Sequence, residues 1–428
     1  MRSGEPPVDG TDHARLPLAV YALALSLFAI GTTEFVIVGL LPNIAGDLHV
    51  SVSTTGLLVT AYALGIAFGG PLLLAATAGW PRKRLLLTLM AAFIVGNLAC
   101  ALAPSFAILL VVRVLTSFTH AAFVAVALQL AMSLVDEDLK GRAIAAVLGG
   151  LTIALAVGVP LGTVIGQQLG WRSAFVGVGA IGAVALAVDA RLLSETAPAP
   201  AVAIRAQLAL LGNRRLAVPL ITTVLAIAGL IAAYTYITPF LEQVSGFHAG
   251  SISLLLIVFG ASAAAGNFLA GSALDHWPLM TPPITLSALA VILAVAGVTA
   301  ETHVGAIITL VAWGAAGFGL FPILQHQALR PAGIHANVVN ALNISAANLG
   351  IAIGALVGGQ IVAGVGLHDV PLVGALIVLS ATVLAVNTAH GARRATHTGA
   401  FATKPPLLET APRATNVLGF RARRPPQF

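Results

Sequence analysis

Residues 16–41 read LPLAVYALALSLFAIGTTEFVIVGLL, an apolar stretch with a single charged residue, Glu34. A helix needs about 20 mostly apolar residues to cross a bilayer, so this stretch predicts a transmembrane helix. It is longer than the hydrophobic region of a signal peptide and lacks a convincing cleavage site, so we expect it to be retained. Over the whole chain 58% of residues are hydrophobic and 8% are charged, whereas soluble domains are about 25% charged. The composition therefore predicts a protein embedded in lipid.

Further apolar runs follow, separated by polar breaks, and with the first they predict twelve transmembrane helices and an all-α membrane protein. The 44 glycines suit such a bundle, because small residues let helices approach closely within lipid. One cysteine, Cys100, lies in an apolar run, so no intrachain disulfide is expected. The expected spans are 16–41, 54–78, 85–103, 106–134, 143–169, 172–193, 217–241, 251–274, 283–300, 304–329, 337–366 and 371–389.

Alternate loops collect the basic residues, which marks the cytoplasmic side of a membrane protein. The opposite loops carry acidic residues, with Arg172 as their only basic residue. Both termini are therefore expected in the cytoplasm. The basic loops hold Arg82, Lys83, Arg84, Lys140, Arg142, Arg191, Arg205, Arg214, Arg215 and Arg330, and the others Asp47, Glu242, Glu301 and Asp369.

The longest interior polar stretch divides the spans six and six, and it reads as a linker between two bundles. A shift of 197 residues places Gly69 on Gly266 and Trp80-Pro81 on Trp277-Pro278, which supports an internal repeat weakly. Many secondary transporters consist of two such bundles with the substrate between them near the midplane. The expected parts are a cytoplasmic tail (1–15), a six-helix bundle (16–193), a cytoplasmic linker (194–215), a second six-helix bundle (216–391) and a disordered basic cytoplasmic tail (392–428).

Two ionisable residues fall deep inside spans, Glu34 in the first and Arg113 in the fourth. Charges inside a bilayer are costly unless they are paired or hydrated, and they usually mark function. Glu34 precedes Pro42 by eight residues and Arg113 follows Pro104 by nine, so both are expected roughly 12 Å below the outer face. The hypothesis is that Glu34, beside Arg113, binds a proton from outside and releases it inside while substrate competes. A static ion pair joining two helices is the alternative.

Three polar residues, Thr116, Ser117 and His120, follow Arg113 at helical spacing, so one cavity-lining face is expected to carry all four. Histidine titrates near neutral pH, so His120 is a candidate for proton coupling, with a neutral, hydrogen-bonded histidine as the alternative. Other polar residues are expected to bond between helices or to be hydrated at span ends. The first group is Asn97, Asn267, Asn343 and Asn348, and the second is Asp189 and Glu242.

The fifth span carries glycines four residues apart around a proline, a pattern that leaves a groove for a neighbouring helix and bends the segment. It comprises Gly150, Gly158, Pro160, Gly162 and Gly166. This pattern resembles the fifth-helix antiporter motif of the major facilitator superfamily. Further matching stretches are Gly31-Thr-Thr-Glu34-Phe with Gly39-Leu-Leu-Pro42, Gly69-Gly-Pro71, the Arg113 helix, Tyr236-Ile-Thr-Pro239-Phe-Leu, Gly266-Asn267 and Asn348-Leu-Gly350 with Gly354.

Together these stretches resemble the twelve-helix drug:proton antiporters, especially the chloramphenicol-resistance and arabinose-type efflux permeases, over residues 16–390. The resemblance implies the major facilitator fold, two six-helix bundles around a central cavity, in a bacterial inner membrane. It implies that Glu34 is a first-helix acid for proton and substrate binding, and Arg113 the fourth-helix arginine of proton coupling. The first, fourth, seventh and tenth helices would line the cavity with Thr32, Thr33, Thr116, Ser117, Tyr234, Tyr236 and Gln325. A monomer is expected.

One departure concerns the loop after the second helix, where the superfamily carries glycine, an acid four residues on and then basic residues that latch the bundles. The basic residues Arg82, Lys83 and Arg84 are present, but Ala78 stands where the repeat would place the acid. The second half has Gly271 and Asp275 without the basic residues. The sequence therefore leaves the strength of this cytoplasmic latch in doubt.

Three functions remain open. The first is proton-coupled efflux of a small amphiphilic compound such as chloramphenicol, the second is proton-coupled export or uptake of a sugar, nucleoside or amino acid, and the third is a membrane sensor or scaffold without transport. The sequence shows no phosphate loop, metal-ligand cluster or nucleophile with a base, so we expect no enzyme, cofactor or metal. Its basic residues lie in short loops and tails, so nucleic acid is not expected as a partner. The expected partners are a small-molecule substrate, protons and the bilayer.

Overall fold

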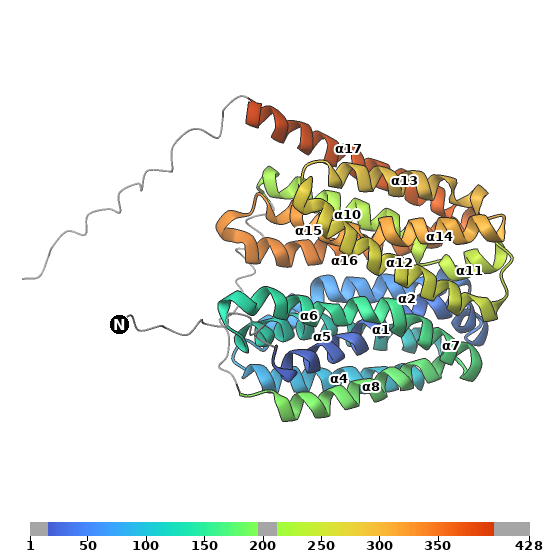
Figure 1. The fold of residues 1–428 in the computed structure, drawn as a ribbon. Coiled ribbons are helices and arrows are strands. Elements are labelled where there is room, and N and C mark those ends of the chain that lie inside the picture. Colours follow the sequence, from blue (N-terminus) through green and yellow to red (C-terminus); the bar gives the residue numbers. More distant parts are fainter. Residues whose placement is uncertain (1–15, 196–211, 398–428) are drawn as a thin grey trace, which may run out of the picture. The chain divides into compact units, whose positions relative to one another are not determined.

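The computed structural model describes residues 16–195 and 212–397, and its regular elements in these ranges are all helices (Figure 1). Twelve helical spans among the described residues are long and apolar enough to cross a membrane. This confirms the predicted fold class. The bounds of the expected N-terminal tail, much of the linker and most of the C-terminal tail lie outside the described residues.

The spans are built from the following helices, several of which are joined end to end. The first half has α1 (Leu18–Asp47), α2 (Val52–Leu64) with η1 (Gly65–Gly69) and α3 (Gly70–Ala76), α4 (Arg82–Ala101), α5 (Phe106–Ser133), η2 (Glu137–Leu139) with α6 (Lys140–Ile153), η3 (Ala154–Gly158) and α7 (Val159–Leu169), and α8 (Trp171–Leu192). The second has α10 (Arg214–Tyr234), α11 (Ile237–Gln243), α12 (Ala249–His276), α13 (Thr281–Thr299), α14 (His303–Phe318), α15 (Leu320–Leu329), η4 (Gly333–His335) with α16 (Ala336–Gly364), and α17 (Val370–His397). We call α1 to α8 the N-terminal helices and α10 to α17 the C-terminal helices.

Two helices run farther than the sequence indicated. Pro42 lies inside α1, which continues to Asp47. A proline in a helix removes one hydrogen bond but does not have to end the helix when packing holds the segment, and Leu40, Leu41 and Ile44 around it are fully buried. Helix α17 extends to His397, beyond Gly391, where the tail was expected to begin.

Four of the described spans are interrupted between their ends. The seventh breaks at Thr235 and Tyr236, between α10 and α11, and the tenth at Gly319, between α14 and α15. The second and fifth each contain a π-helical turn, η1 and η3. Such irregular backbone at membrane depth is tolerated where it is packed within protein or lines a cavity, and it is frequent at functional sites.

The glycines of the fifth span lie against α1, the helix that carries Glu34. A Cβ atom at Gly150 would be 2.1 Å from the Ala24 carbonyl oxygen, and one at Gly158 would be 2.1 Å from the Thr32 hydroxyl. Gly162 and Gly166 continue the contact in the same way, against Val36 and Leu40. Only glycine permits this approach, so the fifth span fixes the position of α1.

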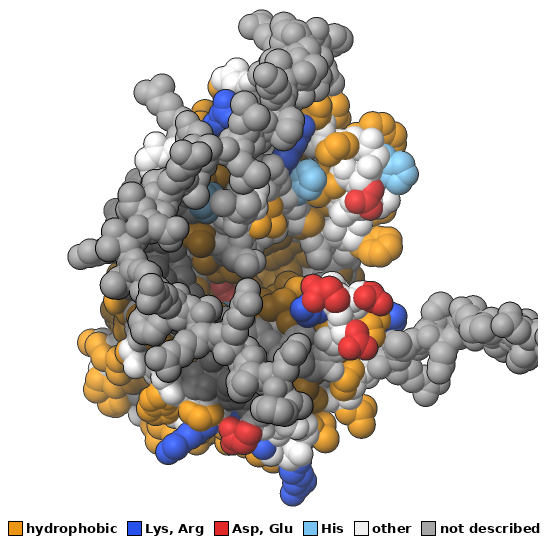
Figure 2. Space-filling model, turned by 90° about the vertical axis from the view of Figure 1, so that its left-hand side faces the viewer, with side chains coloured by type: hydrophobic (Ala, Val, Ile, Leu, Met, Phe, Trp, Pro, Cys, Tyr) orange, Lys and Arg blue, Asp and Glu red, His pale blue; other side chains and the backbone are white. Residues whose placement is uncertain are grey.

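The helices alternate in direction, which gives the bundle two ends. The proximal end carries residues 77–81, 134–139, 277–280 and 330–335, and the distal end carries residues 48–51, 102–105, 244–248 and 365–369. The basic loops lie at the proximal end, which Figure 2 views face on. The exception, Arg172, is at the distal end, where its guanidinium forms an ion pair with Asp47. Its charge is thereby neutralised within its own half.

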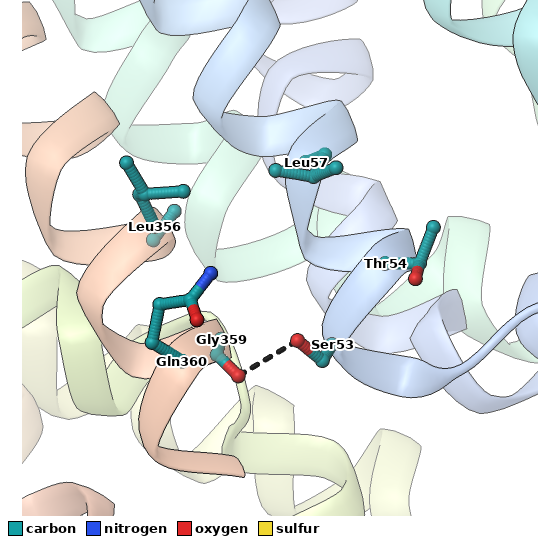
Figure 3. A pocket seen from close by; sticks show the side chains of 7 residues that line it. Ser53, Thr54, Leu57, Leu356, Gly359 and Gln360 are labelled. Carbon is teal, nitrogen blue, oxygen red and sulfur yellow. Dashed lines mark hydrogen bonds between the residues drawn. The ribbon is translucent and has the colours of Figure 1, made fainter. Parts of the chain in front are cut away.

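The N-terminal and C-terminal helices contact each other from the distal end inwards. Ser53 Oγ of α2 donates a hydrogen bond to the Gly359 carbonyl of α16 (2.7 Å), and Ser253 Oγ of α12 donates one to Gln167 Oε1 of α7 (3.3 Å). Beside the first bond lies a groove of about 130 Å³, with α2 and α16 as its walls (Figure 3). The last such hydrogen bond toward the proximal end in the described ranges joins Ser345 to the Ala67 carbonyl (3.3 Å).

At the proximal end the described surface is hollowed between the two sets of helices (Figure 2). Among the described residues, Asp275 forms no ion pair with any of the three basic residues of the expected latch, Arg82, Lys83 and Arg84. Arg84 instead lies over the Trp80 ring, 5.9 Å from its centroid. The expected latch thus has no ion pair in this conformation, whose contacts between the two sets of helices lie toward the distal end.

Candidate functional site

Arg113 of α5 is held deep inside the N-terminal helices, with 1% of its surface exposed. Its Nη1 donates a hydrogen bond to the Thr33 carbonyl of α1 (2.9 Å), and its guanidinium carbon lies 4.0 Å from the centroid of the Tyr62 ring of α2. Neither Nε nor Nη2 has a hydrogen-bond partner among the described residues. The cation thus joins three helices by a carbonyl and a ring face, and no described carboxylate pairs with it.

Glu34 follows Thr33, whose carbonyl binds Arg113, but the carboxylate of Glu34 lies near His120 instead. His120 Nε2 lies 3.9 Å from Glu34 Oε2, and the two side chains are 6% and 14% exposed respectively. On its other side, His120 Nδ1 shares a hydrogen bond with the Tyr62 hydroxyl (3.2 Å). Tyr62 therefore contacts both the histidine that faces the carboxylate and the arginine. The static ion pair between Glu34 and Arg113, which the sequence left open as the alternative, is absent from the part of the chain that the structure describes.

A second polar contact fixes the same turn of α1. The Thr33 hydroxyl donates a hydrogen bond to Asn97 Oδ1 of α4 (2.5 Å), and Asn97 Nδ2 donates one to the Phe93 carbonyl (2.9 Å). Thr33 is thus held by its side chain on one side and by its carbonyl, through Arg113, on the other. Glu34 is positioned by the rigidity of this turn.

The two remaining candidates on α5 lie at contacts between helices rather than on the open surface that we expected. Thr116 Oγ1 donates to its own helix and lies where a Cβ at Gly96 of α4 would be 2.3 Å away. Ser117 Oγ would lie 1.7 Å from a Cβ atom added at Gly65 of η1. Both residues are small enough to let α5 approach its neighbours, and this explains their position.

Aromatic rings join the two sets of helices beside Glu34. Phe35 of α1 meets the Tyr234 ring of α10 edge to face at 6.2 Å, and Tyr234 stacks on Phe259 at 5.1 Å and contacts Phe318 at 5.5 Å. Phe318 in turn stacks on Phe321. These rings occupy the level at which the seventh and tenth spans are interrupted.

Tyr236, another expected cavity residue, is buried at a helix contact instead. Its hydroxyl donates to the Ala355 carbonyl of α16 (3.0 Å), and its ring fits against Gly56 and Gly359. It belongs to the distal closure.

Gln325 is partly exposed in α15 and takes part in a network of amides. Its Nε2 donates to Asn340 Oδ1, and its Oε1 accepts from Asn343 Nδ2 (2.8 Å). Asn343 Oδ1 accepts from the Thr223 hydroxyl of α10 (2.8 Å). Asn343 thus bonds between helices as expected, but as part of a larger network than the sequence indicated.

Asp189 differs from the expectation that it is hydrated at a span end. It is fully buried, and its Oδ2 accepts a hydrogen bond from Ser26 of α1 (2.7 Å). Helix α8 packs on α1 and α4, and Asp189 lies on the face that is covered by this packing although the helix ends three residues later.

Two functional candidates, Tyr62 and Asn340, were not singled out from the sequence. The signal for Tyr62 was available, since it is one of four tyrosines in the chain and lies within an apolar span. Among the described residues, no group of three or more His, Cys, Asp or Glu side chains lies close enough to hold a metal ion.

The comparisons with known proteins agree with this architecture. A solved structure of a bacterial homologue of the human lysosomal transporter Spinster superposes with a TM-score of 0.67 at 17% identity, covering 91% of this chain and 98% of that one. The "Uncharacterized MFS-type transporter YtbD" of Bacillus subtilis is 39% identical over 86% of this chain and 94% of its own length.

Two further relatives carry a substrate in their names. The "Chloramphenicol resistance protein" of Streptomyces lividans is 34% identical over 80% of this chain and 88% of its own length. The "Probable sugar efflux transporter" of Mannheimia succiniciproducens is 32% identical over 84% of this chain and 90% of its own. The family model "Major Facilitator Superfamily" matches residues 23–355. Twelve membrane-spanning helices, the shared fold and this match make the chain a member of the major facilitator superfamily of transporters.

Proposed function

We propose that this transporter exports a small, largely apolar compound in exchange for protons, and that Glu34 carries the proton. The observation that supports this most is the surroundings of Glu34, a nearly buried carboxyl 3.9 Å from His120, with Arg113 bonded to the preceding carbonyl. A carboxyl in such a place has two charge states that differ strongly in their interaction with the protein.

The conformation supports a role in alternating access. If the basic loops mark the cytoplasm, the proximal end and both termini are cytoplasmic, and the protein is closed toward the outside. Substrate then enters from the cytoplasm and meets Glu34 in its ionised form. After the distal contacts open, a proton from outside neutralises Glu34, and substrate leaves. Return to the inward-open state releases that proton to the cytoplasm.

Phe35 gives this cycle a physical connection to the other set of helices. It follows Glu34 in the chain and contacts Tyr234 of α10. A change of charge at Glu34 that shifts this turn of α1 therefore acts directly on a contact between the moving parts.

Sugar export is the second candidate, and the relatives named as sugar efflux transporters favour it. Proton-coupled uptake and a sensor without transport are the remaining alternatives, and both predict a different result in the same experiment.

The test uses everted membrane vesicles that contain the full chain and carry an imposed proton gradient. Adding chloramphenicol is expected to dissipate the gradient with the wild type and not with Glu34→Gln. Glu242→Gln, which changes an acid at the end of α11, is the matched control and should behave as the wild type. Inward accumulation in whole cells would instead indicate symport, and an unchanged response of Glu34→Gln would exclude Glu34 as the carrier.

A further inference from the structure

The amide network of the C-terminal helices has a direction. The Thr223 hydroxyl donates to Asn343 Oδ1, Asn343 Nδ2 donates to Gln325 Oε1, and Gln325 Nε2 donates to Asn340 Oδ1. The side-chain oxygen of each amide in this network thus accepts a hydrogen bond from the preceding member. The network ends at the NH2 group of Asn340, which donates no hydrogen bond to any described residue.

The faces of α16 show where this group lies. One face packs on α10, where Cβ atoms at Gly350 and Gly354 would lie 2.7 and 2.3 Å from α10 carbonyl oxygens. A second face meets the N-terminal helices, through Ser345 and Ala352, which bond to η1 and α2. At roughly 100° per residue, Asn340 lies on the arc between these two faces, opposite the lipid side.

This arc is open only in its proximal half. Ile344, one turn from Asn340, is 43% exposed, whereas Ile351, about two turns farther toward the distal end, is 5% exposed. Asn340 itself is partly exposed. The exposed strip therefore belongs to the space between the two sets of helices, which the distal contacts close above it.

The same space has an apolar part next to the amides. On α15, Phe321 and Gln325 are four residues apart and share a face, and Phe321 stacks on Phe318. A ligand that lies along this face meets aromatic rings at one end and hydrogen-bond donors at the other.

Charge is absent from this part of the site. In the described C-terminal helices, the Asp, Glu, Lys and Arg residues up to Val386 lie at or near helix ends or in loops. The buried ionisable residues Glu34, Arg113 and Asp189 belong instead to the N-terminal helices. Proton coupling and substrate recognition would thus fall to different halves.

We infer that Asn340, supported by Gln325 and Asn343, is a substrate-binding residue that donates hydrogen bonds to an uncharged compound bearing hydroxyl, carbonyl or nitro oxygens. This inference rests on the proposed transport function and adds the class of substrate. It places the polar end of the ligand at α16 and its apolar end against Phe318 and Phe321.

The test measures binding of radiolabelled chloramphenicol, an uncharged compound with hydroxyl and nitro groups, to the purified full-length protein in detergent. Ethidium, a cation without oxygen acceptors, is the second probe. The wild type is expected to prefer chloramphenicol. Asn340→Leu should weaken chloramphenicol binding about fivefold, as the loss of one hydrogen bond does, and leave ethidium binding unchanged. Asn340→Asp, which replaces the donor by oxygen, should weaken chloramphenicol binding further.

Asn267→Leu, an amide in α12 outside this network, is the matched control, and thermal unfolding verifies that each variant is folded. The inference is overturned if the wild type binds chloramphenicol no better than ethidium, or if Asn340→Leu binds it as well as Asn267→Leu does. The proposed function fails separately. Asn340-dependent binding without any chloramphenicol effect on a proton gradient would exclude coupling and leave the binding residue in place.

Discussion

Arg113 shows why one particular cation is needed in the N-terminal helices. Its planar guanidinium places a face on the Tyr62 ring while an edge N–H reaches the Thr33 carbonyl. An ammonium group is compact and strongly hydrated, so it cannot make both contacts with the same geometry. The side chain therefore links α1, α2 and α5 by its shape as well as by its charge.

Arg113→Lys is accordingly expected to insert into the membrane but to lose most transport. A hydrogen bond from a charged donor contributes about 1.5–3 kcal/mol, and its loss frees the turn that carries Glu34. The measurement is chloramphenicol-driven dissipation of the gradient, with the amount of inserted protein as reference. Transport at the wild-type rate would mean that only the charge matters at this position.

Tyr62→Phe tests the hydrogen bond to His120 without changing the ring that faces Arg113. It removes the hydroxyl that lies 3.2 Å from His120 Nδ1 and leaves a buried imidazole nitrogen without this partner. We expect a loss of about 1 kcal/mol in stability and an altered pH profile of efflux. A lower unfolding temperature with an unaltered pH profile would assign the pair a purely structural role.

At this scale the sequence predicted the right neighbourhood but not its contacts. Glu34 and Arg113 were predicted to be neighbours because their expected depths in the bilayer are equal. In the structure Arg113 of α5 does bond to the turn of α1 that carries Glu34. Depth does not specify rotation about the helix axis, so the contact of Arg113 with Tyr62 and the proximity of His120 to the carboxylate could not be derived. The prediction that Asp189 is hydrated was wrong for a related reason. The position of a residue along a helix does not show which neighbouring helices cover the end of that helix.

Among the helices, the fifth span is the element whose sequence explains most of its packing. Its glycines lie along α1. A Cβ would meet backbone at Gly150, the β-branched side chains of Thr32 and Val36 at Gly158 and Gly162, and the end of the Leu40 side chain at Gly166. The motif is therefore a contact surface for α1, the helix that carries Glu34.

Adjacent glycines in α6 offer a matched test of that surface. Gly150→Ala places a Cβ 2.1 Å from the Ala24 carbonyl oxygen, whereas a Cβ at Gly149 has no neighbour within 4 Å. Gly150→Ala should destabilise by about 1–3 kcal/mol, because overpacking forces the helices apart. Gly149→Ala should be neutral or stabilise by up to about 1 kcal/mol, since alanine is the better helix former. Equal unfolding temperatures for both variants would contradict this packing.

The spans themselves could be predicted because each one must satisfy its own backbone within lipid. Their interruptions could not. The breaks at Thr235 and Gly319 and the π-helical turns η1 and η3 depend on neighbours that supply the lost contacts, and Pro42, the strongest breaker in the first span, lies inside an unbroken helix.

For the whole molecule, the closed distal end is a property of one conformation. A transporter that alternates between two states has one sequence for both, so composition and spacing predict the two sets of helices but not which end is closed. The hydrogen bonds of Ser53 and Gln167 and the contact of Tyr236 with Gly56 of α2 identify that end here. All three depend on close approach of helix backbones or on polar pairs that no periodic pattern encodes.

A disulfide across the distal contact tests whether this end must open during transport. A Cβ at Gly359 would lie 3.3 Å from Ser53 Oγ and 2.6 Å from the Tyr236 hydroxyl. Ser53→Cys with Gly359→Cys therefore places two thiols within bonding reach once Tyr236→Phe has removed that hydroxyl. In a Cys100→Ala background, oxidation is expected to cross-link the pair and stop chloramphenicol efflux, and reduction to restore it.

Ala78→Cys with Asp275→Cys is the matched pair at the proximal end, where the latch residues form no ion pair among the described residues, and it should cross-link more slowly in the absence of substrate. Rapid cross-linking of this proximal pair would mean that the resting protein is closed at the proximal end rather than at the distal end. Unchanged efflux in the oxidised distal pair would show that transport does not require these helices to separate, because a covalent bond between α2 and α16 prevents any opening along that line.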